Sequence, residues 1–279
     1  MPDWAAILEE LGVAGDTPRP VSGGDISAAW RVGDVFLKTG PASSFDMFSA
    51  EAEGLAELAA AGAVRAPAVV ACNTVTGTAF IATEWLEFGR ATRETEARLG
   101  RRLARLHQVT RDRFGWHRDN TIGLTPQHND WSDDWVRFFQ EQRLGFQLEL
   151  AAKNGFTGSL QEQGARLLKR LPVFFEGYAP RPALLHGDLW GGNWGSCDGE
   201  PVIFDPAVYY GDPESDLAMT RLFGGFGPAF YEAYAELISP ASGSHDRTDL
   251  YQLYHVLNHL NLFGSAYLGR AQELMGRLL

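Results

Sequence analysis

Residues 186–193 read His-Gly-Asp-Leu-Trp-Gly-Gly-Asn, and residues 202–206 read Val-Ile-Phe-Asp-Pro. Short apolar runs at 184–185 and 202–204 predict two strands around a glycine-rich loop. Asp188, Asn193 and Asp205 therefore stand at loop ends beside these strands. Carboxylate and amide oxygens, together with phosphate oxygens, are the ligands that Mg²⁺ prefers. This stretch predicts a magnesium-dependent site.

The spacing of His186, Asp188 and Asn193 matches the His-x-Asp-x-x-x-x-Asn catalytic loop of protein kinases. Phosphoryl transfer needs a base for the attacking hydroxyl, metal ligands, and a lysine on the nucleotide phosphates. The spacing assigns Asp188 as the base, Asn193 as one metal ligand and Asp205 as the main metal ligand. The alternative is an ordinary glycine-rich loop with turn residues, since short motifs also occur by chance.

Lys38 is the candidate phosphate-binding lysine, and it is one of only three lysines in the chain. It ends the second strand of a hairpin predicted over 30–38, with Gly33-Asp34 as the two-residue turn. Arginine cannot everywhere replace a compact ammonium on a flexible stem.

A helix predicted over 45–61 places Glu51 on the face of Leu55, where it can pair with Lys38. Glu53 is the competing acid and is expected to face solvent.

Two further segments are candidates for nucleotide binding. The glycine-rich turn over 21–27 contains Gly23 and Gly24, whose backbone N–H groups could hold phosphate, although most such glycine pairs are simple turns. Glu84 and Leu86 follow the last strand of the first third, where a backbone edge could pair with adenine. An ordinary strand end explains that segment equally well.

The layout predicts a β-rich part over 1–86 and a mainly helical part over 87–279, with one small sheet inserted over 183–205. Strands are expected near 66–71 and 78–85, and helices around Leu99–Leu106 and Trp131–Phe139. The length suits two domains or one two-lobed unit. We therefore expect an α/β fold with two lobes.

Composition narrows the class of protein. The formal net charge is −11, which argues against nucleic-acid binding. No apolar run has the length of a membrane span, no secretory signal is visible, and two cysteines cannot build a disulfide framework. A cytoplasmic protein that does not bind membranes is expected.

Two other clusters have weaker claims to chemistry. His255 and His259 are four residues apart on a predicted helix, but no glutamate lies between them as a zinc hydrolase would require. The aromatic segment over 131–139 fits core packing better than ligand binding. Asp130, Asp133 and Asp134 beside it could still face a cationic amine.

Longer stretches carry a pattern of their own: Ser22–Ser27, Glu51–Leu55, Phe114–Trp116, Asp119–Gly123, Pro126–Trp131, Trp135–Phe139, Arg143-Leu144, His186–Asn193, Phe204–Pro206, Asp216–Thr220 and Leu222–Phe226. With them the chain resembles the fructosamine kinase (ketosamine kinase) family. That family is part of the protein-kinase-like superfamily, which also includes aminoglycoside and choline kinases. The resemblance implies a bilobal protein-kinase-like fold that uses ATP and Mg²⁺. It also implies phosphorylation of the 3-hydroxyl of a ketosamine, the adduct of a sugar with an amine, and hence deglycation.

The resemblance also assigns roles. It implies Lys38 and Glu51 as the phosphate-anchoring pair, with Asp188, Asn193 and Asp205 as above. Trp190 then lies against the sugar, and His186 and Asp216 give structural support. Asp216 is expected to cap the following helix and to support the catalytic loop from beneath.

Two departures from the family and kinase patterns matter. Asp25 stands where many relatives have a cysteine in the glycine-rich loop, so thiol-based redox switching is not expected. Pro206 follows Asp205 without a phosphorylatable activation loop, so regulation by that route is not expected. The alternatives are another small-molecule kinase, acting on an aminoglycoside, choline or a sugar, and a non-catalytic nucleotide-binding module.

Overall fold

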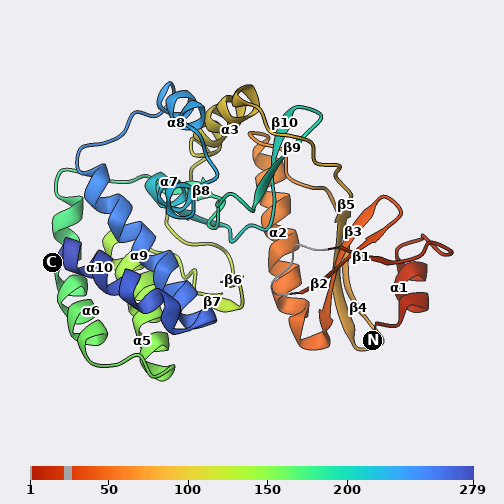
Figure 1. Cartoon of the computed structure of the whole chain (residues 1–279), viewed down its shortest axis with the longest axis horizontal. Coiled ribbons are helices and arrows are strands. Elements are labelled where there is room, and N and C mark those ends of the chain that lie inside the picture. The colour runs from red at the N-terminus through yellow and green to blue at the C-terminus, as the bar shows by residue number, and fades with distance from the viewer. Residues whose placement is uncertain (1, 22–26) are drawn as a thin grey trace.

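The computed structural model describes residues 2–21 and 27–279 (Figure 1). The N-terminal part contains a five-stranded antiparallel sheet in the order β1-β2-β3-β5-β4. Its strands are β1 (Arg19–Val21), β2 (Ala28–Val32), β3 (Val35–Pro41), β4 (Val69–Val75) and β5 (Thr78–Glu84). The predicted glycine pair, Gly23 and Gly24, lies outside the described residues, as does Asp25.

Helices cover both faces of this sheet (Figure 1). Helix α1 (Trp4–Glu10) packs Ile7 with Leu37 of β3 and Phe80 of β5. Helix α2 (Phe45–Ala61) packs on the opposite face with Ile81 of β5. Side chains alternate between the faces of a strand, so Lys38, next to Leu37, lies on the face that α2 covers. Local alternation thereby aims the lysine at the helix that carries its expected partner.

The C-terminal part is mainly helical. Its helices are α3 (Arg93–Leu106), α4 (Trp135–Phe139), η2 (Gln140–Gly145), α5 (Phe146–Lys153), α6 (Ser159–Arg170), η3 (Leu171–Phe175), α7 (Pro213–Leu222), α8 (Pro228–Ala235), α9 (Ser244–Phe263), η4 (Ser265–Tyr267) and α10 (Leu268–Leu278). The short helix η1 (Ala42–Ser44) leads into α2. None of the described helices is both long and apolar enough to cross a membrane.

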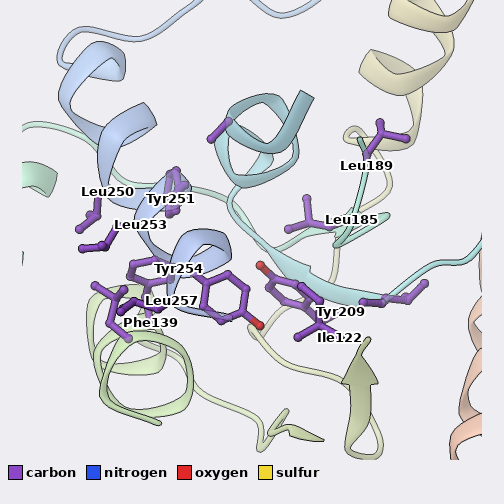
Figure 2. Close-up of a cluster of buried hydrophobic side chains, with 14 of the residues drawn as sticks. Ile122, Phe139, Leu185, Leu189, Tyr209, Leu250, Tyr251, Leu253, Tyr254 and Leu257 are labelled. Atoms are coloured by element: carbon purple, nitrogen blue, oxygen red, sulfur yellow. The ribbon is translucent and has the colours of Figure 1, made fainter. Parts of the chain in front are cut away.

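Helix α9 runs through the centre of this core. Figure 2 shows Tyr251, Tyr254 and Leu257 of α9 packed with Phe139 of α4 and Tyr209. The cluster continues to Leu185 and Leu189, which lie on either side of the predicted catalytic base. The core therefore supports the predicted active-site loop directly.

Three small antiparallel strand pairs complete the fold: β6 (Asn120–Ile122) with β7 (Thr125–Gln127), β8 (Ala183–Leu185) with β11 (Tyr209–Gly211), and β9 (Trp194–Cys197) with β10 (Glu200–Ile203). The expectation of one inserted sheet is therefore wrong. Strands of three or four residues carry too little periodicity to reveal their partners.

Most expected elements of the first third are confirmed: the β2–β3 hairpin, the strand near 78–85, and α2, which ends at Gly62 in the left-handed conformation. The expected strand at 66–71 is wrong in position, because β4 begins after Pro67, which cannot donate a ladder hydrogen bond. The helix expected from Trp131 begins at Trp135 instead, because Asp134 accepts from the backbone N–H of Arg137 and caps it there.

Candidate active site

Lys38 is held between two carboxylates from distant parts of the chain. Its Nζ lies 2.8 Å from Glu51 Oε1 and 2.7 Å from Asp205 Oδ1. Burial alone would lower the pKa of Lys38, but the charges of Glu51 and Asp205 outweigh it and raise the pKa above its ordinary value. The ammonium is therefore fixed and charged at the boundary between the sheet and the second half of the chain.

Glu53, the competing acid, lies on another face of α2. Its side chain is 40% exposed, in line with the expectation that it faces solvent, but its carboxylate also contacts Arg118 and His117, which was not expected. Helical periodicity separates the two faces of α2, but it cannot reveal which distant segment packs on each.

The loop that carries Asp188 follows β8 and requires glycine at its first bend. Gly187 has φ +84°, and a Cβ atom there would come within 2.0 Å of the carbonyl oxygen of Ala207. The backbone of the Asp188 loop therefore touches the backbone that follows Asp205. No residue with a side chain fits at position 187 without moving one of these segments.

His186 joins these two segments through its ring. Its Nε2–H donates to the carbonyl of Phe204 (3.0 Å), while its Nδ1 accepts from the backbone N–H of Asp188 (3.3 Å). Burial lowers the pKa of His186, in keeping with a neutral ring that donates at one nitrogen and accepts at the other.

Asp216 supports the loop from α7. Its two carboxylate oxygens accept from the backbone N–H groups of His186 and Gly187, both at 2.8 Å, and His107 Nε2 lies 3.2 Å away. Burial would raise the pKa of Asp216, but the hydrogen bond from His107 and those from the loop hold it below its ordinary value. The expectation that Asp216 caps its helix is wrong: Asp212 is the N-cap, and Asp216 lies in the first turn.

The carboxyl group of Asp188 faces the same cavity as Lys38. Asn193 Nδ2 donates to the carbonyl of Asp188 (2.9 Å) and lies 3.4 Å from its Oδ2. Burial and the nearby charges of Asp205 and Asp216 raise the pKa of Asp188 to about 7. A carboxylate of raised basicity suits the acceptance of a hydroxyl proton.

The donor set at Asn193 and Asp205 fits a hard cation. The amide nitrogen of Asn193 is turned toward Asp188, which leaves its Oδ1 as the acceptor, and one oxygen of Asp205 is not bound to Lys38. Both residues line one cavity of about 190 Å³. Asp205 has φ +55°, a backbone conformation that aspartate tolerates better than most residues. Two oxygen donors with room for phosphate oxygens match what Mg²⁺ requires.

A second, more apolar cavity of about 380 Å³ adjoins the first and shares Lys38, Glu51 and Asp205 with it. Both Glu84 and Leu86 line it. The Glu84 carboxylate is occupied by Arg65 (2.9 Å) and by the backbone N–H of Ala68 (3.0 Å), and the backbone N–H of Glu84 donates to the carbonyl of Ala68 (2.9 Å). This leaves the carbonyl of Glu84, which has only a long contact with the Thr83 hydroxyl (3.4 Å). Within the described residues, the backbone N–H and carbonyl of Leu86 have no hydrogen-bond partner.

Trp190 lies at the mouth of the smaller cavity. Its ring covers Gly192, where a Cβ atom would come within 2.3 Å of the indole, and the ring is partly exposed. Next to it comes a series of rings that sequence reasoning missed. The ring centroid of Phe223 lies 6.5 Å from that of Trp190, and the ring centroid of His259 lies 4.8 Å from that of Phe223. The rings of Phe263 and Tyr267 follow, with centroids 5.5 and 5.1 Å from that of His259. We call these five residues the aromatic wall.

Part of the aromatic wall was accessible from the sequence. Phe223 belongs to the motif over 222–226 that the resemblance rests on. His259 was considered only as a metal ligand, yet its Nδ1–H donates to the carbonyl of His255 (2.8 Å) within α9. The described residues contain no cluster of three or more His, Cys, Asp or Glu side chains with metal-site geometry.

The close contacts of Lys38 with two carboxylates lead us to expect that even a conservative replacement lowers activity. Lys38→Arg keeps the charge, but a planar guanidinium is too wide for a site shaped to an ammonium between two carboxylates. We expect at least a ~10-fold loss in kcat/KM for ATP. Steady-state kinetics will check this, and the same change at surface Lys153 is expected to have no effect. A fully active Lys38→Arg enzyme would show that the ammonium is not a specific phosphate ligand.

The antiparallel sheet with its Lys38–Glu51 pair, which faces Asp188 and the oxygen donors Asn193 and Asp205, is typical of a protein-kinase-like fold. The ADP-bound structure of the aminoglycoside phosphotransferase APH(2'')-Ib has the same fold, with a TM-score of 0.67 at 15% identity over 98% of this chain and 97% of that one. The predicted fold class is confirmed.

Within that class the chain belongs to the fructosamine kinase family, whose sequence profile matches residues 6–279. It is 42% identical to the probable ketoamine kinase of Synechocystis sp., over 99% of this chain and 97% of that protein. The solved structure of a candidate fructosamine-3-kinase of Thermobifida fusca has a TM-score of 0.87 at 31% identity, covering 99% of this chain and 98% of that one. The resemblance seen in the sequence motifs is confirmed.

Proposed function

We propose that this chain transfers the γ-phosphoryl group of ATP to the 3-hydroxyl of a ketosamine, between an N-terminal lobe (1–86) and a C-terminal lobe (87–279). One observation carries the chemistry: Lys38 is held by Glu51 and Asp205 at the edge of a cavity that also contains Asp188 and Asn193. Family membership and the relatives named for ketoamine and fructosamine phosphorylation support the choice of acceptor.

The larger cavity is proposed to hold the nucleotide base. Its apolar lining suits an adenine ring, and the backbone N–H and carbonyl of Leu86 can pair with the edge of that ring. Lys38 then binds the phosphates, which extend toward the smaller cavity. A role for Gly23 and Gly24 in covering them stays a prediction from the sequence.

Asn193 and Asp205 would hold Mg²⁺, which when bound neutralises charge on the phosphate oxygens. Asp188 accepts the proton of the acceptor hydroxyl as that oxygen attacks, and Asn193 fixes the orientation of the loop through its bond to the Asp188 carbonyl. His186 and Asp216 hold the loop in place so that the base does not have to reorganise. The catalytic contribution of these residues is mainly positioning.

The aromatic wall is proposed to take the acceptor. An aromatic ring covers the apolar C–H face of a sugar well, and Trp190 is the member nearest to Asp188. The more distant rings, Phe263 and Tyr267, extend outward from the sugar and offer a surface for the arm that bears the amine. This arrangement favours a sugar joined to a larger amine over a free sugar.

The acceptor is tested by a matched panel. With ATP and Mg²⁺, we expect a fructosyl- or ribulosyl-amine to be consumed at least ~10-fold faster, by kcat/KM, than the free sugar or the free amine. A 3-phosphate next to the C2 carbonyl is a good leaving group after enolisation toward C1. Phosphate and free amine should therefore appear slowly after the enzyme is removed.

The Trp190→Ala variant separates the acceptor role from the chemistry. We expect kcat/KM for the ketosamine to fall at least ~10-fold while the affinity for ATP stays unchanged. Trp85→Ala, at the nucleotide cavity, is the matched comparison, since it should affect ATP instead. If a free sugar, choline or an aminoglycoside proves the better acceptor, the ketosamine assignment is wrong. The alternative, another small-molecule kinase, then takes its place.

A further inference from the structure

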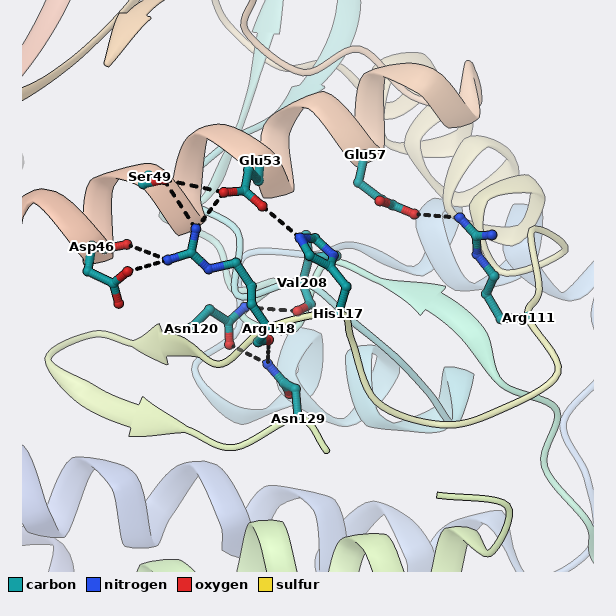
Figure 3. Close-up of polar contacts among 10 residues, drawn as sticks. All are labelled: Asp46, Ser49, Glu53, Glu57, Arg111, His117, Arg118, Asn120, Asn129 and Val208. Atoms are coloured by element: carbon teal, nitrogen blue, oxygen red, sulfur yellow. Dashed lines mark hydrogen bonds and ion pairs between the residues drawn. The ribbon is translucent and has the colours of Figure 1, made fainter. Parts of the chain in front are cut away.

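Helix α2 carries a row of polar side chains on the face that does not hold Glu51. Asp46, Ser49, Glu53 and Glu57 are spaced three to four residues apart and so line one side of the helix. Figure 3 shows them facing Arg118, His117 and Arg111, which precede the β6–β7 hairpin. Glu51, two residues from Glu53, points about 200° away around the helix, toward Lys38.

Arg118 makes most of these contacts. Its guanidinium donates to Ser49 Oγ (3.1 Å), to Glu53 Oε1 (2.5 Å), and to both the carboxylate and the backbone carbonyl of Asp46. His117 Nε2 lies 2.7 Å from the other oxygen of Glu53. The Arg118 side chain is only 22% exposed, so this is a packed, multidentate contact rather than a solvated surface pair.

The same segment also binds the backbone that follows Asp205. Asn120 Nδ2 donates to the carbonyl of Val208 (2.8 Å), and Gln127 Nε2 donates to the carbonyl of Ala207 (3.0 Å) (Figure 3 shows the first of these). Asn129 ties the two ends of the segment together, because its Nδ2 donates to the carbonyl of Arg118 (3.1 Å) and to Asn120 Oδ1 (2.9 Å).

Helix α2 closes this arrangement by direct packing. At Gly54 a Cβ atom would lie 3.1 Å from a methyl of Val208 and 3.5 Å from the ring of Pro206. The segment over 117–129 therefore contacts both parts of the chain that supply a partner to Lys38. These are α2, which carries Glu51, and residues 205–208 before β11, which begin with Asp205.

We propose that the segment 117–129 is a brace that holds α2 and the residues after Asp205 in the positions Lys38 requires, with Arg118 as its principal positioning residue. This inference rests on the proposed function, in which Lys38 binds phosphate. In protein kinases the lysine–glutamate pair and the metal-binding aspartate are brought into place by the movement of a helix and a phosphorylated loop. Here Pro206 follows Asp205 without such a loop, and the brace performs that positioning by permanent contacts.

The scarcity of lysine makes the state of Lys38 directly observable. In protein labelled with ¹⁵N at lysine Nζ, only Lys38, Lys153 and Lys169 contribute ammonium signals, and Lys38→Arg assigns the buried one. We expect Arg118→Gln to shift the Lys38 signal and to speed its proton exchange with water at least ~5-fold. The two surface lysines should stay unchanged.

The matched control is Arg101→Gln. Arg101 also makes a bidentate pair, with Glu236 (2.7 and 3.1 Å), but it lies on α3 and does not contact α2. We expect this variant to leave the Lys38 signal unchanged. Arg118→Lys keeps the charge but loses the planar guanidinium that donates to several partners at once. It should therefore change the Lys38 signal and its proton exchange less than Arg118→Gln does. An unchanged Lys38 signal in folded Arg118→Gln protein would overturn the proposal.

Kinetics provide the second readout. We expect Arg118→Gln to lower kcat at least ~10-fold with a smaller change in the KM for ATP, and Arg101→Gln to change neither. If Arg118→Gln does not fold, Asp46→Asn is the substitute, because it removes the charge of one exposed partner of Arg118. It should move the Lys38 signal in the same direction, and an unchanged signal would contradict the brace. The NMR measurement needs no acceptor, so a failed ketosamine assay would count against the proposed substrate and not against the brace.

Discussion

Replacing Asp188 by asparagine is expected to lower kcat at least ~100-fold while leaving the affinity for ATP nearly unchanged. The amide keeps the size of the side chain and its contact with Asn193, but it cannot accept the hydroxyl proton. Single-turnover measurements and ATP titration will separate the two effects. The control is Asp198→Asn in the exposed β9–β10 turn, where φ is +54° and asparagine is tolerated. Wild-type turnover in Asp188→Asn would remove Asp188 as the base.

The raised pKa of Asp188 also leads us to expect that kcat/KM depends on pH. Burial and the Asp205 and Asp216 charges raise the pKa of Asp188 to about 7. The base must be deprotonated, so kcat/KM for the acceptor should fall as the pH drops through the pKa of Asp188. A cation at Asn193 and Asp205 would favour the carboxylate and lower that pKa. We therefore expect the acid limb to move to lower pH as Mg²⁺ is raised, and to be absent from the residual activity of Asp188→Asn.

Asp205→Ala is expected to abolish the Mg²⁺-dependent part of ATP binding, because the site loses its charged oxygen donor. Calorimetric titration with and without Mg²⁺ measures this directly. Asp205 has φ +55°, which strains alanine, so Asp205→Asn is the companion variant: it tolerates that backbone and removes only the charge. The two variants should agree. If both variants kept the ATP affinity of the native protein at all Mg²⁺ levels, the assigned ligand set would be wrong.

Sequence reasoning succeeded where the information is local. The β2–β3 hairpin and α2 follow from turn chemistry and periodicity, and the loop of Asp188 and Asn193 follows from motif spacing. The pairing of Lys38 with Glu51 was also expected, because strand alternation and helix periodicity aim the two side chains at each other.

Reasoning from the sequence failed where a contact joins distant segments of the chain. Glu53 meets Arg118 across 65 residues, and nothing in the spacing of either residue indicates this partner. The expectation for Asp216 fails for a related reason: the helix begins at Pro213, so Asp212 forms the cap, while Asp216 in the first turn binds the backbone of the Asp188 loop. The roles of the site residues themselves remain predictions that the variants above will decide.

The close approach at Gly187 has a consequence for how this enzyme can evolve. Asp188, the proposed base, and Asp205, the proposed metal ligand, lie on two loops that touch backbone to backbone, so exchanging side chains does not adjust the separation of these loops. The aromatic wall is the opposite case, since it is made of side chains: Trp190 on the loop of Asp188, Phe223 after α7, His259 and Phe263 on α9, and Tyr267 on η4. Substitutions in this proposed acceptor surface can therefore change which acceptors fit while the spacing of the two loops stays the same.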